Sequence, residues 1–347
     1  MKRVPPLVVR RAVLAPAVVA IEVVLIVASP VLLALAVAAS PFFGRWRPLR
    51  MLTIVLSFVV RHQVASVACL GLWVASGFGR RQAGEPMQRA HYAVLRWFVS
   101  GIYATILRYA HVDVRVVGSA EVEEALSAAR RPVVMLSRHA GEGDTLLVLA
   151  HLLGRYGRRP RVVMHEALRL DPLIDMLGDR LPNRFVDPRG GDTEVEIAAM
   201  SRDLEDRSAV LIFPEGGNFS ERHRRKGIER LEGAGHAEQA EWARGMVHMS
   251  APRPGGALAA IAAAPHADVV FAGHVGFPGS LGEVWRLLPH EQTVEVRLWM
   301  AEAAELPAAH DERIDWLFGW WRTIDAWVAE QHSSPDPKDG AYSRRDP

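Results

Sequence analysis

The stretch PVVMLSRHAGEGDTLLVLAHLL, residues 132–153, decides the fold that we expect for this chain. Its first five residues are apolar and include two valines, so they predict a buried β-strand. Leu146–Leu153 is long enough for a helix, and Asp144 lies where a helix would begin. His139 would then lie at the carboxyl end of a strand, which is where open α/β sheets bind their ligands.

His139 and Asp144 form a candidate catalytic pair across this strand-to-helix turn. The carboxylate can hold one nitrogen of the imidazole ring, which leaves the other nitrogen as a general base for a hydroxyl proton. The pattern His-x-x-x-x-Asp is a weak signal by itself, because histidines before helices are common. A histidine with a purely structural role is the alternative.

A second stretch, AVLIFPEGGNFS, covers Ala209–Ser220 and is another apolar strand that leads into Pro-Glu-Gly-Gly. Two glycines let the backbone approach a ligand closely, and backbone N–H groups in such a turn can bind an anionic oxygen. Taken alone, this stretch is equally compatible with an ordinary turn after a core strand.

The two stretches, in this order, resemble the glycerolipid acyltransferase family of 1-acylglycerol-3-phosphate acyltransferases. Members of that family carry His-x-x-x-x-Asp and then Phe-Pro-Glu-Gly. The resemblance implies that His139 is the catalytic base, that Asp144 orients it, and that Glu215 and Gly216 help to bind the acceptor phosphate. Three further segments resemble the eukaryotic-type branch of the family: Asn218–Ser220, Val247–Arg253 and the helix around Trp316.

The arginine that binds the acceptor phosphate is left open by this resemblance. In the family an arginine follows a phenylalanine by three residues, whereas Arg189 follows Phe185 one place later. The threonine and arginine that usually follow the Glu-Gly pair are absent. Arg189 and Arg253 are therefore the candidates for the phosphate-binding arginine, and Arg222 is a further source of charge.

Composition and charge favour a membrane partner over nucleic acid. The net charge of +2 is too small to indicate nucleic-acid binding, and half of the residues are hydrophobic, with the highest density in the first eighty positions. Basic residues lie beside the apolar N-terminal runs, which suits anionic lipid headgroups. The single cysteine, Cys69, excludes an intramolecular disulfide and a cysteine-based zinc site.

Two apolar runs at the N-terminus predict a membrane anchor. Val23–Gly44 carries no charge and is long enough to span a bilayer, and we favour a retained anchor over a cleaved signal peptide. Met51–Phe78 is interrupted by Arg61 and His62. This pattern fits a tilted, re-entrant or interfacial helix as well as it fits a second crossing of the membrane. A helical hairpin packed on the globular domain is the remaining alternative. The distribution of basic residues favours a cytoplasmic location for both ends of the hairpin.

Strand and helix patterns alternate after His139, which predicts an α/β fold with a mainly parallel sheet flanked by helices. An N-terminal helical membrane-anchoring hairpin precedes it. We expect N-terminal membrane-associated helices at 1–82, an acyltransferase domain at 83–332 and a disordered tail at 333–347. Arg222–Arg230 is expected as a basic surface run, and Glu232–Arg244 as a helix. Asp311–Gln331 predicts a helix packed into the core, with the membrane interface as an alternative for its extra tryptophans.

The family resemblance implies an O-acyltransferase, and the apolar runs and basic residues of the N-terminus predict that it is membrane-bound with its catalytic domain on the cytoplasmic face. The donor would be acyl-CoA or acyl carrier protein, the acceptor a lysophospholipid, most simply 1-acylglycerol-3-phosphate, and no other cofactor or metal would be needed. Another lysophospholipid or a glycolipid is the alternative acceptor. A non-catalytic lipid-binding protein is a second class of function. A metal-dependent phosphoesterase is a third, with ligands drawn from His139, Glu142, Asp144, His165, His223 and His248.

Overall fold

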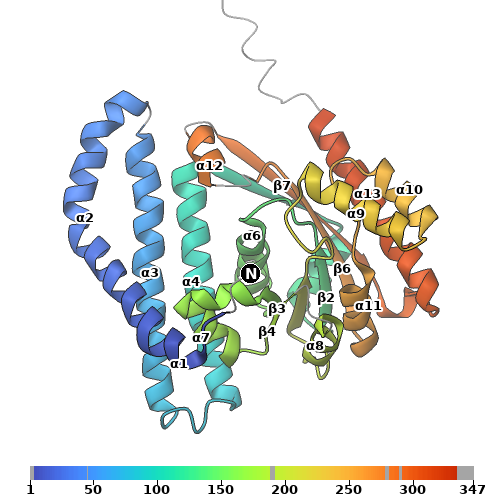
Figure 1. Cartoon of the computed structure of the whole chain (residues 1–347), viewed down its shortest axis with the longest axis horizontal. Helices are drawn as coiled ribbons and strands as arrows, with labels where there is room; N and C mark the ends of the chain where they lie inside the picture. Colours follow the sequence, from blue (N-terminus) through green and yellow to red (C-terminus); the bar gives the residue numbers. More distant parts are fainter. Residues whose placement is uncertain (1–3, 45, 188–191, 278–280, 289–290, 334–347) are drawn as a thin grey trace, which may run out of the picture.

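The computed structural model describes residues 4–44, 46–187, 192–277, 281–288 and 291–333, and it is organised around one seven-stranded sheet (Figure 1). The strand order is β1-β7-β6-β2-β5-β3-β4. Every neighbouring pair is parallel except β6 with β7, which is antiparallel. The predicted α/β fold with a mainly parallel sheet is therefore confirmed. The strands are β1 Val112–Val117, β2 Val133–Ser137, β3 Arg159–His165, β4 Arg184–Val186, β5 Ser208–Ile212, β6 Asp268–Val275 and β7 Gln292–Ala301.

The central strands β2 and β5 are buried along their whole length, as expected for parallel strands with helices on both faces. Their side chains alternate between two cores. Val133 and Met135 pack into one core with helices α4, α5 and α6, whereas Val134 and Leu136 pack into the other with α8 to α11 and α13. Leu136 is paired with Ile212, so β2 and β5 end side by side and the loops that follow them meet at one edge.

The helices of the two outer layers agree with the expected ones in most places. The first layer contains α4 Glu85–Ala110, α5 Ala120–Ala128, α6 Asp144–Ala150 and α12 Leu281–Leu287, and α7 Pro172–Arg180 packs against α3 and α4. The second contains α8 Thr193–Met200, α9 Glu221–Gly233, α10 Ala237–Gly245, α11 Pro254–Ala263 and α13 His310–Ser333. Shorter helical turns cover Arg10–Leu14, His151–Arg155, Glu166–Leu170 and Ala303–Glu305.

The basic surface run Arg222–Arg230 lies in a regular helix, α9, whose start is capped by the Ser220 side chain, which accepts a hydrogen bond from the backbone amide of His223. The helix expected over Glu232–Arg244 is instead divided between α9 and α10. In α13, Trp321 and Trp327 are buried in the second core, so packing in the core explains the tryptophans of this helix.

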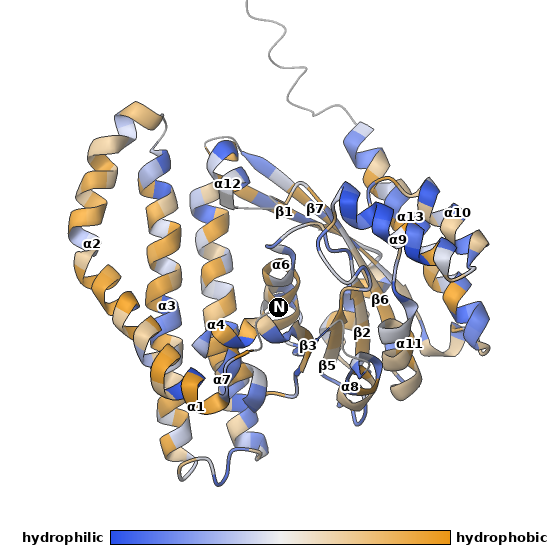
Figure 2. Cartoon of the chain, viewed as in Figure 1, coloured by the Kyte–Doolittle hydropathy of each residue, from blue (hydrophilic) through white to orange (hydrophobic). Residues whose placement is uncertain are grey.

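The N-terminal hairpin consists of α1 Leu7–Val9, α2 Ala15–Phe43 and α3 Arg47–Ala75 (Figure 1). Both long helices are apolar and long enough to cross a membrane. Helix α3 packs between α2 and α4, whereas the outward side of α2 is exposed and apolar (Figure 2). Val27, for example, is 74% exposed. The hairpin is thus attached to the globular domain through α3 and presents α2 as an apolar surface.

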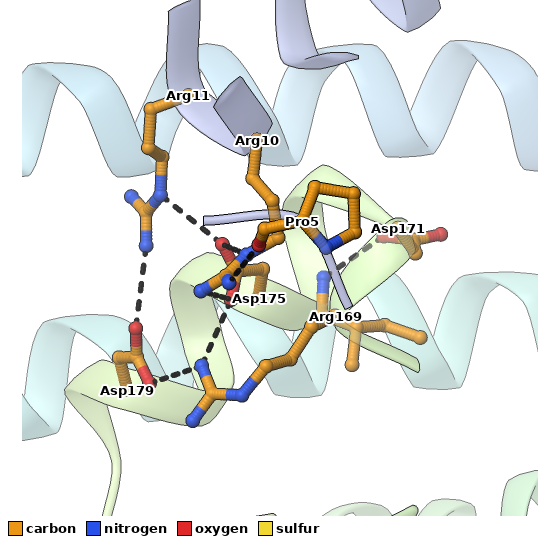
Figure 3. Close-up of polar contacts among 8 residues, drawn as sticks. Pro5, Arg10, Arg11, Arg169, Asp171, Asp175 and Asp179 are labelled. Atoms are coloured by element: carbon orange, nitrogen blue, oxygen red, sulfur yellow. Dashed lines mark hydrogen bonds and ion pairs between the residues drawn. The ribbon is translucent and has the colours of Figure 1, made fainter. Parts of the chain in front are cut away.

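Charged contacts dock the start of this hairpin onto α7 (Figure 3). The carboxylate of Asp175 is 1% exposed and is contacted by Arg10 at 3.1 Å, Arg11 at 3.2 Å and Arg169 at 3.0 Å. Asp179 adds weaker contacts to Arg11 and Arg169 at the surface. A buried carboxylate surrounded by three guanidinium groups ties the N-terminal segment to α7 and the globular part of the chain.

Two more contacts hold the hairpin farther along its length. His62 on α3 lies between two carboxylates, 2.6 Å from Glu22 of α2 and 3.2 Å from Asp171 before α7. At the tip, the ring of Phe43 makes an edge contact with Trp285 of α12. The expected tail, 333–347, lies outside the described residues except for Ser333, which ends α13.

Candidate active site

His139 lies just beyond the carboxyl end of β2, with its side chain 19% exposed. Its position follows from the sheet, because β2 is flanked by β5 and β6 and all three end at the same edge. The ring stacks on Phe213, which follows β5, with 4.3 Å between the ring centres. The backbone oxygen of His139 accepts a hydrogen bond of 2.7 Å from the amide of Phe219. Neighbouring loops therefore fix both the ring and the backbone of this residue.

Asp144 is the first residue of α6 and is almost completely buried. Its Oδ2 accepts a hydrogen bond of 2.8 Å from the amide of Gly141 and lies 3.2 Å from Nδ1 of His139. Burial alone would raise the pKa of the Asp144 carboxyl, but the charge of His274 and the contacts with both histidines and the Gly141 amide hold it well below its usual range. Asp144 is therefore ionised and fixes a proton on Nδ1 of His139. The Nε2 atom makes no hydrogen bond to any described residue, so it is the ring nitrogen available to accept a proton.

Glu215 supports this arrangement from the Pro-Glu-Gly-Gly turn. Its side chain is buried, and its two oxygens accept hydrogen bonds from the backbone amides of His139 at 2.8 Å and Ser250 at 2.9 Å. Burial raises the pKa of the Glu215 carboxyl to about 7, although these two amides and Arg138 favour its ionised form. Glu215 thus joins the loop after β2 to the loop before α11. A direct contact between Glu215 and a substrate stays a prediction.

Arg138 crosses beneath the site as a buried cation. Its guanidinium donates to the backbone oxygens of His274 and, at 3.1 Å, His248. Burial lowers the pKa of the guanidinium, while the nearby carboxylates of Glu215 and Asp144 raise it. Arg138 therefore connects the backbone at His248 and His274 to the loop that contains His139.

Gly216 and Arg253 form the part of the site nearest to solvent. Gly216 has φ +74°, a conformation that favours glycine, and a Cβ there would lie 2.9 Å from Nε of Arg253. The Arg253 amide donates to the Pro214 oxygen at 2.8 Å, so its backbone is fixed to the same turn. Arg230 on α9 is close enough that the charge of Arg253, together with burial, lowers the pKa of Arg230. Among the described residues, neither arginine has an acidic partner in an ion pair.

The residues predicted from the sequence meet at this edge with one exception. His139, Asp144, Glu215, Gly216 and Arg253 lie together, whereas Arg189 falls outside the described residues. Arg222 is exposed in the first turn of α9. The histidines offered as metal ligands have other contacts: His165 accepts from the amide of Ala167, His223 donates to the Glu215 oxygen, and His248 stacks on His332. No group of three potential metal ligands occurs in the described part of the chain.

His274 is the residue that sequence reasoning missed. It lies on β6, is 2% exposed, and its Nε2 is 3.3 Å from Oδ1 of Asp144. A single histidine in an apolar strand carries no sequence signal that links it to Asp144. Only the pairing of β6 with β2 brings it to the catalytic pair.

Two adjoining cavities, of about 500 and 870 Å³, lie beside the ends of β3 and β4. Both are lined by Glu166, Arg169, Asp179 and Asp187, and the larger is closed on one side by residues 4–7 and Arg10 of the N-terminal segment. His139 lines neither cavity, so the candidate site lies outside both of them. The cavities lie along the same edge of the sheet as the site.

Comparison with known proteins gives one match. Residues 113–255 match the model of the family described as Acyltransferase. The matched segment runs from β1 into the start of α11 and contains His139, Asp144, Glu215, Gly216 and Arg253, but not His274. No curated protein matches the chain. The match supports an acyltransferase domain on glycerolipids in general, and the eukaryotic-type branch stays a prediction.

Proposed function

We propose that this protein transfers a fatty acyl chain from acyl-CoA or acyl carrier protein to a hydroxyl group of a lysophospholipid, with 1-acylglycerol-3-phosphate as the acceptor. The observation that carries the proposal is the His139–Asp144 pair within the segment that matches the Acyltransferase family. A buried carboxylate holds Nδ1 of a partly exposed imidazole, which leaves Nε2 free to act as the base. Phospholipid synthesis or remodelling would use this reaction.

The chemistry needs one base and no covalent acyl-enzyme. Nε2 of His139 takes the proton of the acceptor hydroxyl while the oxygen attacks the thioester carbonyl. The tetrahedral intermediate then collapses, the C–S bond breaks, and the imidazolium returns the proton to the departing thiolate, so that an ester and a free thiol leave. Asp144 stabilises the imidazolium between the two proton transfers, as a buried carboxylate does in hydrolytic triads.

The acceptor phosphate would bind at Gly216 and Arg253. The exposed guanidinium of Arg253 lies across the glycine turn that follows Glu215, and no acid among the described residues neutralises it. Arg230 adds a second positive charge. Charge-assisted hydrogen bonds from arginine to phosphate are strong, so this pair suits a phosphate-bearing acceptor. Arg189, which lies outside the described residues, remains a second candidate.

We also propose that α2 and α3 hold the protein at the membrane with the acyltransferase domain on the cytoplasmic face. The apolar outward side of α2 and the packing of α3 on α4 favour a hairpin that enters and returns (Figure 2). Arg10 and Arg11 bind α7, which is consistent with the N-terminus and the domain on one side. A tag placed after Pro347 should be digested by protease in vesicles that expose the cytoplasmic face. A protected tag would contradict this orientation.

The catalytic proposal is tested by assaying purified full-length protein with acyl-CoA and lysophosphatidate, with and without a chelator. His139→Ala should reduce kcat by about 10²- to 10⁴-fold, because proton transfer is lost. His266→Ala, which removes an exposed histidine elsewhere, is the matched control and should retain full activity. Turnover that survives His139→Ala would refute the mechanism. Activity that depends on a metal and releases phosphate would favour the phosphoesterase, and lipid binding without turnover would favour the non-catalytic alternative.

A further inference from the structure

We infer that His274 is a positioning residue for the catalytic pair, holding Asp144 from the side opposite His139. The inference rests on the proposed function. Oδ2 of Asp144 lies 3.2 Å from Nδ1 of His139, and Oδ1 lies 3.3 Å from Nε2 of His274. One carboxylate therefore lies between two imidazole rings, one partly exposed and one buried.

The need for His274 follows from the burial of Asp144. Oδ2 receives the Gly141 amide and the His139 ring, whereas Oδ1 and Nε2 of His274 are both buried, lie 3.3 Å apart, and have no other hydrogen-bond partner among the described residues. A buried carboxylate oxygen that lacks a partner is costly, and its side chain is free to turn toward another donor. The His274 ring is the group placed to donate to Oδ1, so it fixes the plane of the Asp144 carboxylate.

The fold holds His274 rigidly in this place. β6 pairs with β2 so that Ser137 lies opposite Ala272, and the Arg138 amide donates to the Ala272 oxygen at 2.9 Å. The Arg138 guanidinium then donates to the backbone oxygen of His274 itself. Side chains alternate along β6, and Ala272 packs into the core on the α6 side. His274, two residues later, faces the same side, where Asp144 begins α6.

His274 affects His139 through the shared carboxylate. A proton donated by His274 to Oδ1 withdraws negative charge from the carboxylate, so Asp144 accepts less strongly from Nδ1 of His139. Two other charged side chains among the described residues lie beside these three groups. Arg138 is bound to the backbone oxygen of His274, and Glu215 is bound to the backbone amide of His139. Without His274 the carboxylate would hold the proton of His139 more strongly. The base would then stay protonated, and inactive, up to a higher pH.

The test compares His274→Ala with His274→Gln in the full-length protein, using acyl-CoA and lysophosphatidate. His274→Ala should lower kcat about 10- to 100-fold, the effect typical of a residue that orients a catalytic group, with KM changed less than about 2-fold. The acid limb of its pH–rate profile should move up by about half a pH unit. His274→Gln keeps an N–H donor in reach of Oδ1, so it should recover most of kcat and the original profile.

Two controls separate positioning from folding. His151→Ala removes another histidine on the α6 side, one that bonds the Leu147 oxygen and not Asp144, and should leave the pH profile unchanged. In an Asp144→Asn background, His274→Ala should have little further effect, because both changes break the same contact. If His274→Ala lowered kcat by the same factor in the Asp144→Asn background as in the wild type, the inference would be overturned.

A ring-nitrogen NMR titration gives a readout that does not need turnover. The titration midpoint of His139 should be higher in His274→Ala than in the wild type, and His274→Gln should restore it. If the wild type is active, and His274→Ala has the same pH–rate profile and the same His139 titration midpoint as the wild type, the role of His274 is refuted while the proposed function stands. An inactive wild type would refute the proposed function, and the NMR midpoint would still decide whether His274 acts on His139 through Asp144.

Discussion

Replacing Glu215 by Gln should make the stability of the folded protein less sensitive to high pH, even though it disturbs the site. The carboxyl group is wholly buried, and burial raises its pKa from the ordinary 4.5 to about 7, against the two backbone amides that favour the charged form. Glutamine has the same shape and is neutral at every pH. The protonated acid can still accept from the amides of both His139 and Ser250, whereas the N–H₂ group of glutamine cannot accept from either of them.

The sign and size of the effect follow from this raised pKa. A group whose pKa is higher in the folded state contributes its full stability below pH 4.5, and that contribution is lost as the pH rises to about 7. The difference between 4.5 and 7 corresponds to about 3 kcal/mol of unfolding free energy. The stability of Glu215→Gln relative to the wild type should therefore rise by about 3 kcal/mol between strong acid and pH values above 7. Its kcat should nevertheless be lower, because the amide N–H₂ group opposes one of the backbone N–H groups.

The unfolding free energies of the variant and the wild type are measured by urea titration in mild detergent at pH 5 and pH 8, with tryptophan fluorescence as the signal. Titrations of all other groups cancel when the variant and the wild type are compared at the same pH. Glu142→Gln, at an exposed acid on the loop after β2, is the matched control and should show no such pH dependence. A constant deficit of Glu215→Gln at both pH values would refute the reasoning. It would mean that the two backbone hydrogen bonds outweigh burial and keep Glu215 ionised throughout.

Two further substitutions test the phosphate site and the docked hairpin. Gly216→Ala should raise KM for lysophosphatidate several-fold with little change in kcat, because the left-handed conformation costs about 1 kcal/mol and the new methyl group displaces Arg253. Gly217→Ala, whose Cβ would meet its nearest neighbour at 3.4 Å, is the control, and equal effects at both glycines would argue against a site at Gly216. Asp175→Asn should destabilise the protein by about 3 kcal/mol and speed trypsin cleavage after the N-terminal arginines, whereas Asp179→Asn, at a 38% exposed carboxylate, should change little. Unchanged cleavage in Asp175→Asn would show that the ion pairs do not hold the segment.

Residues close together in the sequence account for what could be predicted. The apolar strand, the turn and the helix around His139 are local, so their pattern was enough to predict a histidine and a carboxylate in contact, and the structure has them 3.2 Å apart. The alternation of strand and helix predicted a mainly parallel sheet, because parallel strands need a crossover between them. Parallel strands end at one edge, which brought the Pro-Glu-Gly-Gly turn to His139.

Contacts between distant segments could not be predicted in this way. The composition of the apolar hairpin left open whether it spans, re-enters or packs, and the docking of α3 on α4 became evident only in three dimensions. The part of Glu215 in binding the acceptor phosphate stays a prediction, and its hydrogen bonds to the backbone amides of His139 and Ser250 became evident only in the structure.

His274 shows most clearly what only the tertiary structure decided. The sequence by itself determined the contact between His139 and Asp144, because the two residues lie within one turn of chain. It did not determine the partner of the second carboxylate oxygen, since that depends on which strand lies beside β2 and in which register. Strand order and register are set by the packing of the whole sheet between its two helical layers, and no short stretch of sequence encodes them.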